Sequence, residues 1–101
     1  PDLYFENISA IKKGRYIDFN ITIKNSGSID ASDVTLTIFD EDIIIDERDL
    51  GEFKFGSGVS LQTKNLKLKH LSPEKISFVI DNEKKIKELD ENNNIANINL
   101  S

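Results

Sequence analysis

Alternation of apolar and polar side chains over residues 17–24 constrains the possible folds of this chain more than any other feature. The apolar members are Ile17, Phe19, Ile21 and Ile23, and each is followed by a polar residue. Successive side chains of a β-strand point to opposite faces, so this run places one face on a core and the other in water. A helix would require apolar residues three and four positions apart. The run is therefore predicted to be a strand of a half-buried sheet.

Six further segments have strand character, and no segment has a convincing helical pattern. They lie at about residues 3–8, 34–38, 43–45, 59–68, 75–80 and 95–100. Turn residues separate them: Gly14, the three glycines of residues 51–58, and residues 25–28, where we expect Asn25 to cap its own backbone and Gly27 to adopt a left-handed conformation. Seven short strands at this spacing predict an all-β fold, an antiparallel β-sandwich, in a single domain over residues 1–101.

Within the fifth predicted strand, the apolar residues expected to face the core change from odd-numbered to even-numbered positions. Val59 and Leu61 occupy odd positions, whereas Leu66 and Leu68 occupy even ones. One extra residue near Lys64-Asn65 would restore the alternation, so the pattern predicts a β-bulge there.

Composition excludes several functional classes. The 101 residues are 38% hydrophobic, which suffices for one core without disulfides or a structural metal. Eighteen acidic against thirteen basic residues give a net charge of -5, which disfavours nucleic acid as a partner. The absence of cysteine excludes thiol nucleophiles, iron–sulfur clusters and cysteine zinc sites. The lysines of the fifth strand either form a basic strip or, as we favour, protect an exposed edge; they are Lys64, Lys67 and Lys69.

No export or membrane signal is recognisable within residues 1–101. No apolar stretch approaches the length of a membrane helix, and no basic-then-apolar segment opens the sequence. Because the sequence starts at Pro1 and not at methionine, we expect it to be a piece of a longer polypeptide.

Strand parity predicts which loops share an end of the sandwich. If the strands alternate in direction, the loops at 25–33, 51–58 and 81–94 lie at one end, and those at 9–15, 40–42 and 69–73 at the other. Rigid sandwiches commonly present ligand-binding groups on such loops. The first end would gather an acidic rim of Asp30, Asp33, Glu52, Asp81, Glu83, Glu88, Asp90 and Glu91.

The acidic, asparagine-rich tract before the last strand supports two interpretations. Asp81, Glu88, Asp90 and Asn92 offer hard oxygen ligands that a folded loop would converge on calcium, although their spacing is not that of an EF-hand. The structural interpretation, which we favour, has Asn92 and Asn93 hydrogen-bonding loop backbone, as Asn25 and Gly27 do in their own turn, with the acids solvated. Apart from a possible calcium ion we expect no cofactor.

Catalysis is not indicated. Glu88 and Asp90 are a carboxylate pair, but no pocket-forming insertion accompanies them. His70 is the sole histidine, and no serine nucleophile with an orienting acid surrounds it in a recognisable motif, so we expect it to be a surface residue. The chain is predicted not to be an enzyme.

Pieces of sequence distributed over the whole chain resemble the CARDB domain, the cell-adhesion-related domain of bacteria and archaea. They are Pro1-Asp2-Leu3, Ile23-Lys24-Asn25-Ser26-Gly27 with Ala31, Leu50, Gly58, Val79-Ile80-Asp81 and the run from Ile86 through Glu88, Asp90 and Glu91 to Asn92-Asn93. The resemblance implies a seven-stranded immunoglobulin-like β-sandwich. Two departures are Pro73-Glu74, where the family usually has glycine, and the acidic turn within residues 40–49. Both would alter a binding surface and not the fold.

The resemblance also implies a role. We expect a non-catalytic, extracellular module of a larger cell-surface or secreted protein that acts as a spacer or as a protein-interaction unit in adhesion. Its partners would be other proteins or neighbouring domains of the same chain. The alternative is an accessory module that binds calcium or carbohydrate. Exposure of Phe53 and Phe55 together would favour carbohydrate, which is commonly bound on aromatic platforms, and burial of both would disfavour it.

Overall fold

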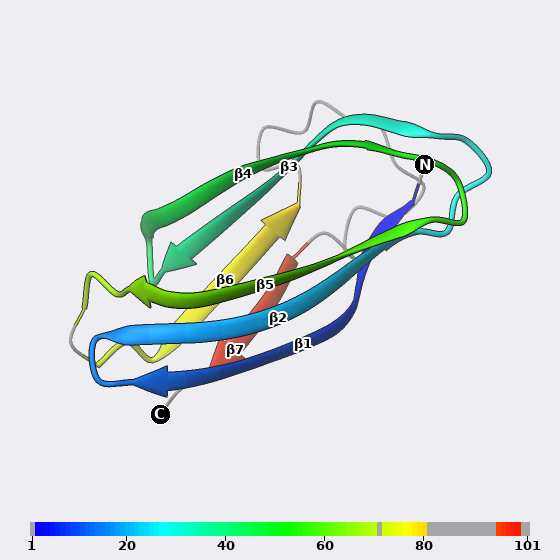
Figure 1. Ribbon diagram of the computed structural model, residues 1–101. Helices are drawn as coiled ribbons and strands as arrows, with labels where there is room; N and C mark the ends of the chain where they lie inside the picture. The colour runs from blue at the N-terminus through cyan, green and yellow to red at the C-terminus, as the bar shows by residue number, and fades with distance from the viewer. Residues whose placement is uncertain (1, 71, 81–94, 100–101) are drawn as a thin grey trace.

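Seven strands arranged in two antiparallel sheets make up the computed structural model, which describes residues 2–70, 72–80 and 95–99 (Figure 1). The strands are β1 (Leu3–Lys13), β2 (Tyr16–Asn25), β3 (Ala31–Asp40), β4 (Ile43–Phe53), β5 (Gly58–Lys67), β6 (Lys75–Ile80) and β7 (Ile95–Asn99). Sheet A has the order β1-β2-β5 and sheet B the order β4-β3-β6-β7. The predicted all-β, immunoglobulin-like sandwich is confirmed. The described residues contain no helix that could span a bilayer.

The core lies between the sheets and is built from the alternating positions that the sequence predicts. Ile17, Phe19, Ile21 and Ile23 of β2 are buried, as are Val34, Leu36 and Ile38 of β3. Across the core, the rings of Phe19 and Phe78 meet edge to face with centroids 5.2 Å apart. The apolar face of each sheet thus covers that of the other, which keeps the two sheets together.

Three strands are longer than predicted, including β3, which begins at Ala31 and ends at Asp40, and one glycine behaves differently. β1 runs to Lys13, and β4 runs to Phe53, so the connection from β4 to β5 is residues 54–57 and not 51–58. Gly14 has a φ of 62°, as expected for its turn, whereas Gly27 is not left-handed. That prediction was wrong because the side chain of Asn25 accepts a hydrogen bond from the Gly27 N–H at 3.0 Å, which closes the turn without a positive φ.

The predicted bulge in β5 is confirmed. Ile17 pairs with Leu66 and Phe19 pairs with Thr63, so two residues of β5 oppose Asp18. One of them, Asn65, is left-handed with a φ of 59°, and its N–H donates to Asp18 Oδ1 at 2.8 Å. Lys13 Nζ lies 2.9 Å from Asp18 Oδ2. The Asn65 hydrogen bond and the Lys13 contact both lower the pKa of Asp18, because they stabilise its charged form.

Three of the four sheet edges are irregular. β5 carries the bulge beside Lys64, and its other predicted edge lysine, Lys67, is also exposed. β1 changes register between Phe5 and Asn7, and the pairing of β4 with β3 shifts three times. The fourth edge, β7, is only five residues long. Bulged, lysine-bearing or short edges resist pairing with another chain, so the sandwich is protected against strand addition.

Candidate functional site

The predicted calcium ligands Asp81, Glu88, Asp90 and Asn92 lie outside the described residues, as does the structural residue Asn93. Within residues 2–70, 72–80 and 95–99, no three acidic or histidine side chains converge as a metal site would require. Calcium binding by the tract therefore stays a prediction from the sequence.

Titration with calcium tests it directly. Isotope-labelled protein is followed by backbone amide NMR while calcium is added, with magnesium as the matched control. A metal site predicts saturable, calcium-selective shifts confined to residues 81–94 and to the adjacent loop at 25–33, because oxygen-rich flexible sites favour the larger ion. Unchanged spectra at about millimolar calcium, the affinity range of weak extracellular sites, would leave the tract as a structural loop.

Asn25 organises the described loops at one end of the sandwich. Its side chain is 1% exposed, and its Oδ1 accepts hydrogen bonds from the N–H groups of Asp2 and Gly27, at 3.1 and 3.0 Å. Its Nδ2 donates to the carbonyl oxygens of Ile29 and Phe53, at 3.0 and 3.3 Å. One amide thus joins the start of β1, the loop after β2 and the end of β4. The proposed backbone capping by Asn25 extends to partners far away in the sequence.

The acidic side chains at the Asn25 end of the sandwich bind groups of the neighbouring loops. Asp30 Oδ1 accepts a hydrogen bond from the Phe55 N–H at 2.9 Å. Lys54 Nζ lies 3.3 Å from Glu52 and 3.9 Å from Asp30, and the hydrogen bond with Glu52 raises the pKa of Lys54. These contacts place the loops at 25–30 and 54–57 at the same end, as strand parity predicts. Of the predicted rim acids, only Asp30, Asp33 and Glu52 belong to the described residues, and these do not form a cluster of three; Asp81, Glu83, Glu88, Asp90 and Glu91 lie outside the described residues.

The proposed aromatic platform does not form. Phe53 is 1% exposed and belongs to the core, whereas Phe55 is 65% exposed at the loop end. Tyr16 is exposed at the opposite end of β2, and Phe39 is half-buried on sheet B. Phe53 and Phe55 are therefore not exposed together, as the carbohydrate interpretation required.

Asp40 and His70 form the polar centre of the other end, which the sequence did not reveal. Asp40 is 0% exposed, and its Oδ2 accepts hydrogen bonds from the N–H groups of Lys69 and His70, at 2.7 and 2.8 Å. Its Oδ1 lies 2.8 Å from His70 Nδ1. His70 thus has an acidic partner, Asp40, that no local sequence motif indicates, and its side chain is still 42% exposed. The sequence did contain a signal for Asp40. It occupies the next alternate position after the inward-facing Leu36 and Ile38, so its side chain is expected to point inward as well.

Opposing effects act on the charge of Asp40. Burial raises the pKa of its carboxyl group, but the hydrogen bonds from His70 and from the Lys69 N–H outweigh burial and lower the pKa below its usual value. The side chain of His70 is partly exposed, and among the described residues it hydrogen-bonds Asp40 and no serine hydroxyl. The pair ties the segment after β5 to the end of β3, and it lacks the nucleophile of a hydrolytic triad.

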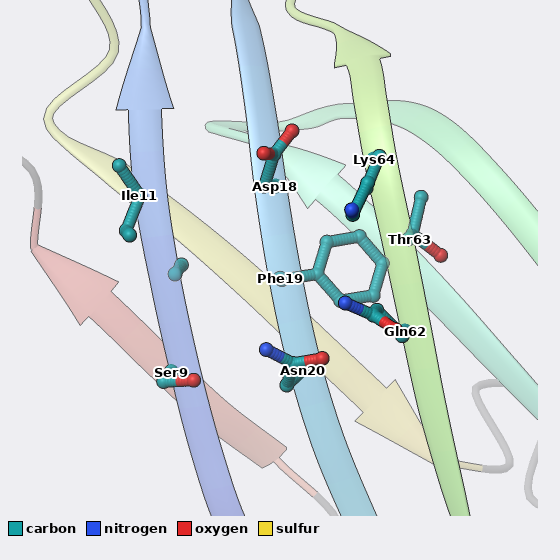
Figure 2. A pocket seen from close by; sticks show the side chains of 9 residues that line it. Ser9, Ile11, Asp18, Phe19, Asn20, Gln62, Thr63 and Lys64 are labelled. Carbon is teal, nitrogen blue, oxygen red and sulfur yellow. The ribbon is translucent and has the colours of Figure 1, made fainter.

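A shallow depression of about 170 Å³ lies on sheet A, across the bulge (Figure 2). Ser9, Asn20 and Gln62 cross it on three neighbouring strands, and Asp18 and Lys64 lie at one end. At the other end the lining groups are neutral, namely the hydroxyl of Ser9 and the amides of Asn20 and Gln62. The depression is smaller than the roughly 300–1,000 Å³ of ordinary ligand pockets. We therefore regard it as surface relief caused by the bulge.

Thr63 lines this depression, and its buried hydroxyl has no hydrogen-bond partner among the residues that the structure describes. Replacing Thr63 by valine is expected to leave stability unchanged or to raise it by up to about 1 kcal/mol, because the change removes an unsatisfied polar group at constant shape. Denaturant unfolding measures the difference. Thr22→Val is the matched control, since the Thr22 hydroxyl bonds that of Ser60 at 3.1 Å and its loss should destabilise. Equal losses in both variants would show that the Thr63 hydroxyl has a partner in solution.

Comparison with known proteins agrees with this architecture. A solution NMR structure of the CARDB domain of a protein from Pyrococcus furiosus superimposes with a TM-score of 0.80 at 19% sequence identity, covering 99% of this chain and 93% of that one. No curated protein matches the sequence. The CARDB family model matches residues 1–98. The chain therefore belongs to the CARDB family.

Proposed function

We propose that the chain is a non-catalytic, extracellular module of a larger cell-surface or secreted protein, where it acts as a spacer or protein-interaction unit. Membership of the CARDB family supports a β-sandwich module, and the name of the family supports the link to adhesion. The partners would be other proteins or neighbouring domains of the same chain. Asn25 and Gly27 have a structural role in this proposal, which is to hold the loop after β2 in shape.

The observation that carries the proposal is the placement of the first and last strands. Leu3, at the start of β1, pairs with Asn25 at one end of the sandwich, whereas Asn99, at the end of β7, pairs with Lys75 at the other (Figure 1). The molecule measures 41 × 21 × 20 Å along its principal axes. A chain entering at one end and leaving at the other places neighbouring domains in line, which is what a spacer requires.

The family supports the proposal of a module that is not an enzyme, because CARDB domains are small β-sandwich modules. Asp40 and His70 serve the local fold, and the depression on sheet A is too shallow to exclude water from a reacting group. Folds carry function through specific sites. The described residues offer surfaces for contact and no catalytic arrangement.

Surface accessibility in intact cells tests the location. An epitope inserted at the exposed turn around Gly14, within the full parent protein, is probed with antibody before and after lysis. The proposal expects labelling of intact cells, with a cytoplasmic protein as the control that remains unlabelled. Labelling that appears only after lysis would overturn the extracellular assignment.

A further inference from the structure

The outer faces of the two sheets differ in chemistry. On sheet A the outward positions are mostly polar, as at Ser9, Asn20 and Gln62, and the exposed Ile11 and Tyr16 are exceptions. On sheet B they include an apolar set that does not pack on the core: Phe39, Ile44, Val79 and Ile95. Ile44 is 45% exposed and Ile95 is 56% exposed. An apolar set on an outer face marks a surface that another molecule can cover.

Strand register makes these four residues one band. Ile44 of β4 pairs with Phe39 of β3, and Val79 of β6 pairs with Ile95 of β7. The space between the two pairs is filled by Thr37 and Ser77, which pair with Val79 and Phe39, respectively, and are both buried. We name the four apolar residues, with Thr37 and Ser77 between them, the sheet B band. It crosses all four strands without a charged side chain.

Acidic residues border the band on the β4 side. Glu47 pairs with Thr37 and Asp49 pairs with Thr35, so both project from the same face as the band. Both are exposed, and within the part of the chain that the structure describes neither forms an ion pair. An uncharged centre with charged residues at its border is the arrangement of a protein interface. The two acids on the β4 side select basic groups of a partner, whereas the exposed Lys75, two positions before Ser77 on the same face, borders the band on the β6 side.

The protected edges favour contact through this face. Strand addition requires an open, regular edge, whereas β1, β4 and β5 are bulged and β7 is short. A second copy of the chain would bring another molecule of net charge -5 to the acidic border. Basic groups of a partner meet no such repulsion at Glu47 and Asp49.

We propose that the sheet B band is a docking surface for a protein partner that presents apolar side chains flanked by lysine or arginine. The inference rests on the proposed role as a protein-interaction unit and identifies its surface and the chemistry of its partner. Apolar residues of the partner cover Ile44 and Ile95, and its cations approach Glu47 and Asp49.

Short synthetic peptides of leucine and lysine serve as the probe, with leucine–glutamate peptides of the same pattern as the control. Isotope-labelled protein is titrated and followed by amide and methyl NMR. The proposal expects saturable shifts at Phe39, Ile44, Val79 and Ile95 with the lysine peptide only. Ile44→Asp should weaken binding at least about tenfold. The matched Ile11→Asp, which changes a 64% exposed isoleucine on sheet A, should bind as the unchanged protein does.

Charge reversal separates specific docking from general attraction. The double variant Glu47→Lys and Asp49→Lys should weaken binding of the lysine peptide and strengthen that of the glutamate peptide. Shifts on sheet A, equal binding of both peptides, no binding, or concentration-dependent dimerisation through the band would each overturn the proposal. If the peptide does not bind but the epitope is labelled on intact cells, the docking surface alone is rejected. If the peptide binds but the epitope is not labelled on intact cells, the extracellular role alone is rejected.

Discussion

Replacing Asn25 by alanine is expected to lower the free energy of unfolding by about 4 kcal/mol, the largest effect among the substitutions considered. The side chain makes four hydrogen bonds, to Asp2, Gly27, Ile29 and Phe53. Truncation leaves the two N–H groups and two carbonyl oxygens of these residues unpaired around a buried cavity. Denaturant unfolding followed by circular dichroism measures the loss.

Two further variants isolate the cause. Asn25→Asp keeps the size of the side chain but turns a carboxylate oxygen toward the carbonyls of Ile29 and Phe53, so it should also destabilise strongly. Asn20→Ala changes an exposed asparagine of the same strand and should alter stability by no more than about 0.5 kcal/mol. Comparable losses for Asn25→Ala and Asn20→Ala would contradict the role of Asn25 as the organiser of this end.

Replacing Asp40 by alanine is expected to cost about 3 kcal/mol, because three donors from Lys69 and His70 lose their acceptor in a buried position. Asp40→Asn should be milder, at about 1 kcal/mol, since its oxygen still accepts both backbone N–H groups and its amide can donate to the ring of His70. Thermal and denaturant unfolding near neutral pH compare the variants. A loss in the alanine variant no larger than that in the asparagine variant would contradict this account.

The Asp40 carboxylate should also make stability depend on pH. Its pKa is lowered in the folded protein, so the unfolded chain takes up the proton at a higher pH than the native protein does. The stabilisation is therefore complete above the ordinary aspartate pKa of about 4 and is lost as the pH falls through the lowered folded-state pKa. In Asp40→Asn, unfolding free energies between neutral and acidic pH should fall less steeply. A residual slope is expected from Asp18, whose pKa is also lowered.

Patterns between neighbouring residues predicted much of the sandwich. The alternation at residues 17–24 identified the buried face of β2 without knowledge of its partner, because a strand sends successive side chains to opposite faces whatever lies beside it. The parity change in β5 located the bulge at Lys64-Asn65 for the same reason. Strand parity also placed the described loops at the correct ends, since antiparallel connections alternate between ends.

The hydrogen-bond networks of Asn25, at one end, and of Asp40 and His70, at the other, could not be predicted from neighbouring residues, because their partners are far away in the sequence. Asn25 was read as a local turn residue, but two of its partners are Asp2 and Phe53. His70 and its acid, Asp40, are thirty positions apart, so no local motif links them. Phe53 and Phe55 share a parity, yet only Phe53 is buried, because β4 ends there and Phe55 lies in the following turn.

The sequence by itself determined the class of fold, the buried faces of the central strands and the position of the bulge, since all three follow from side-chain periodicity along a single strand. Only the tertiary structure decided which polar groups are buried together and which outer face is apolar. Phe39, Ile44, Val79 and Ile95 belong to four different strands, and they form one band only because sheet B has the order β4-β3-β6-β7. Strand order depends on long-range pairing, and that pairing defines both the two polar centres and the proposed docking surface.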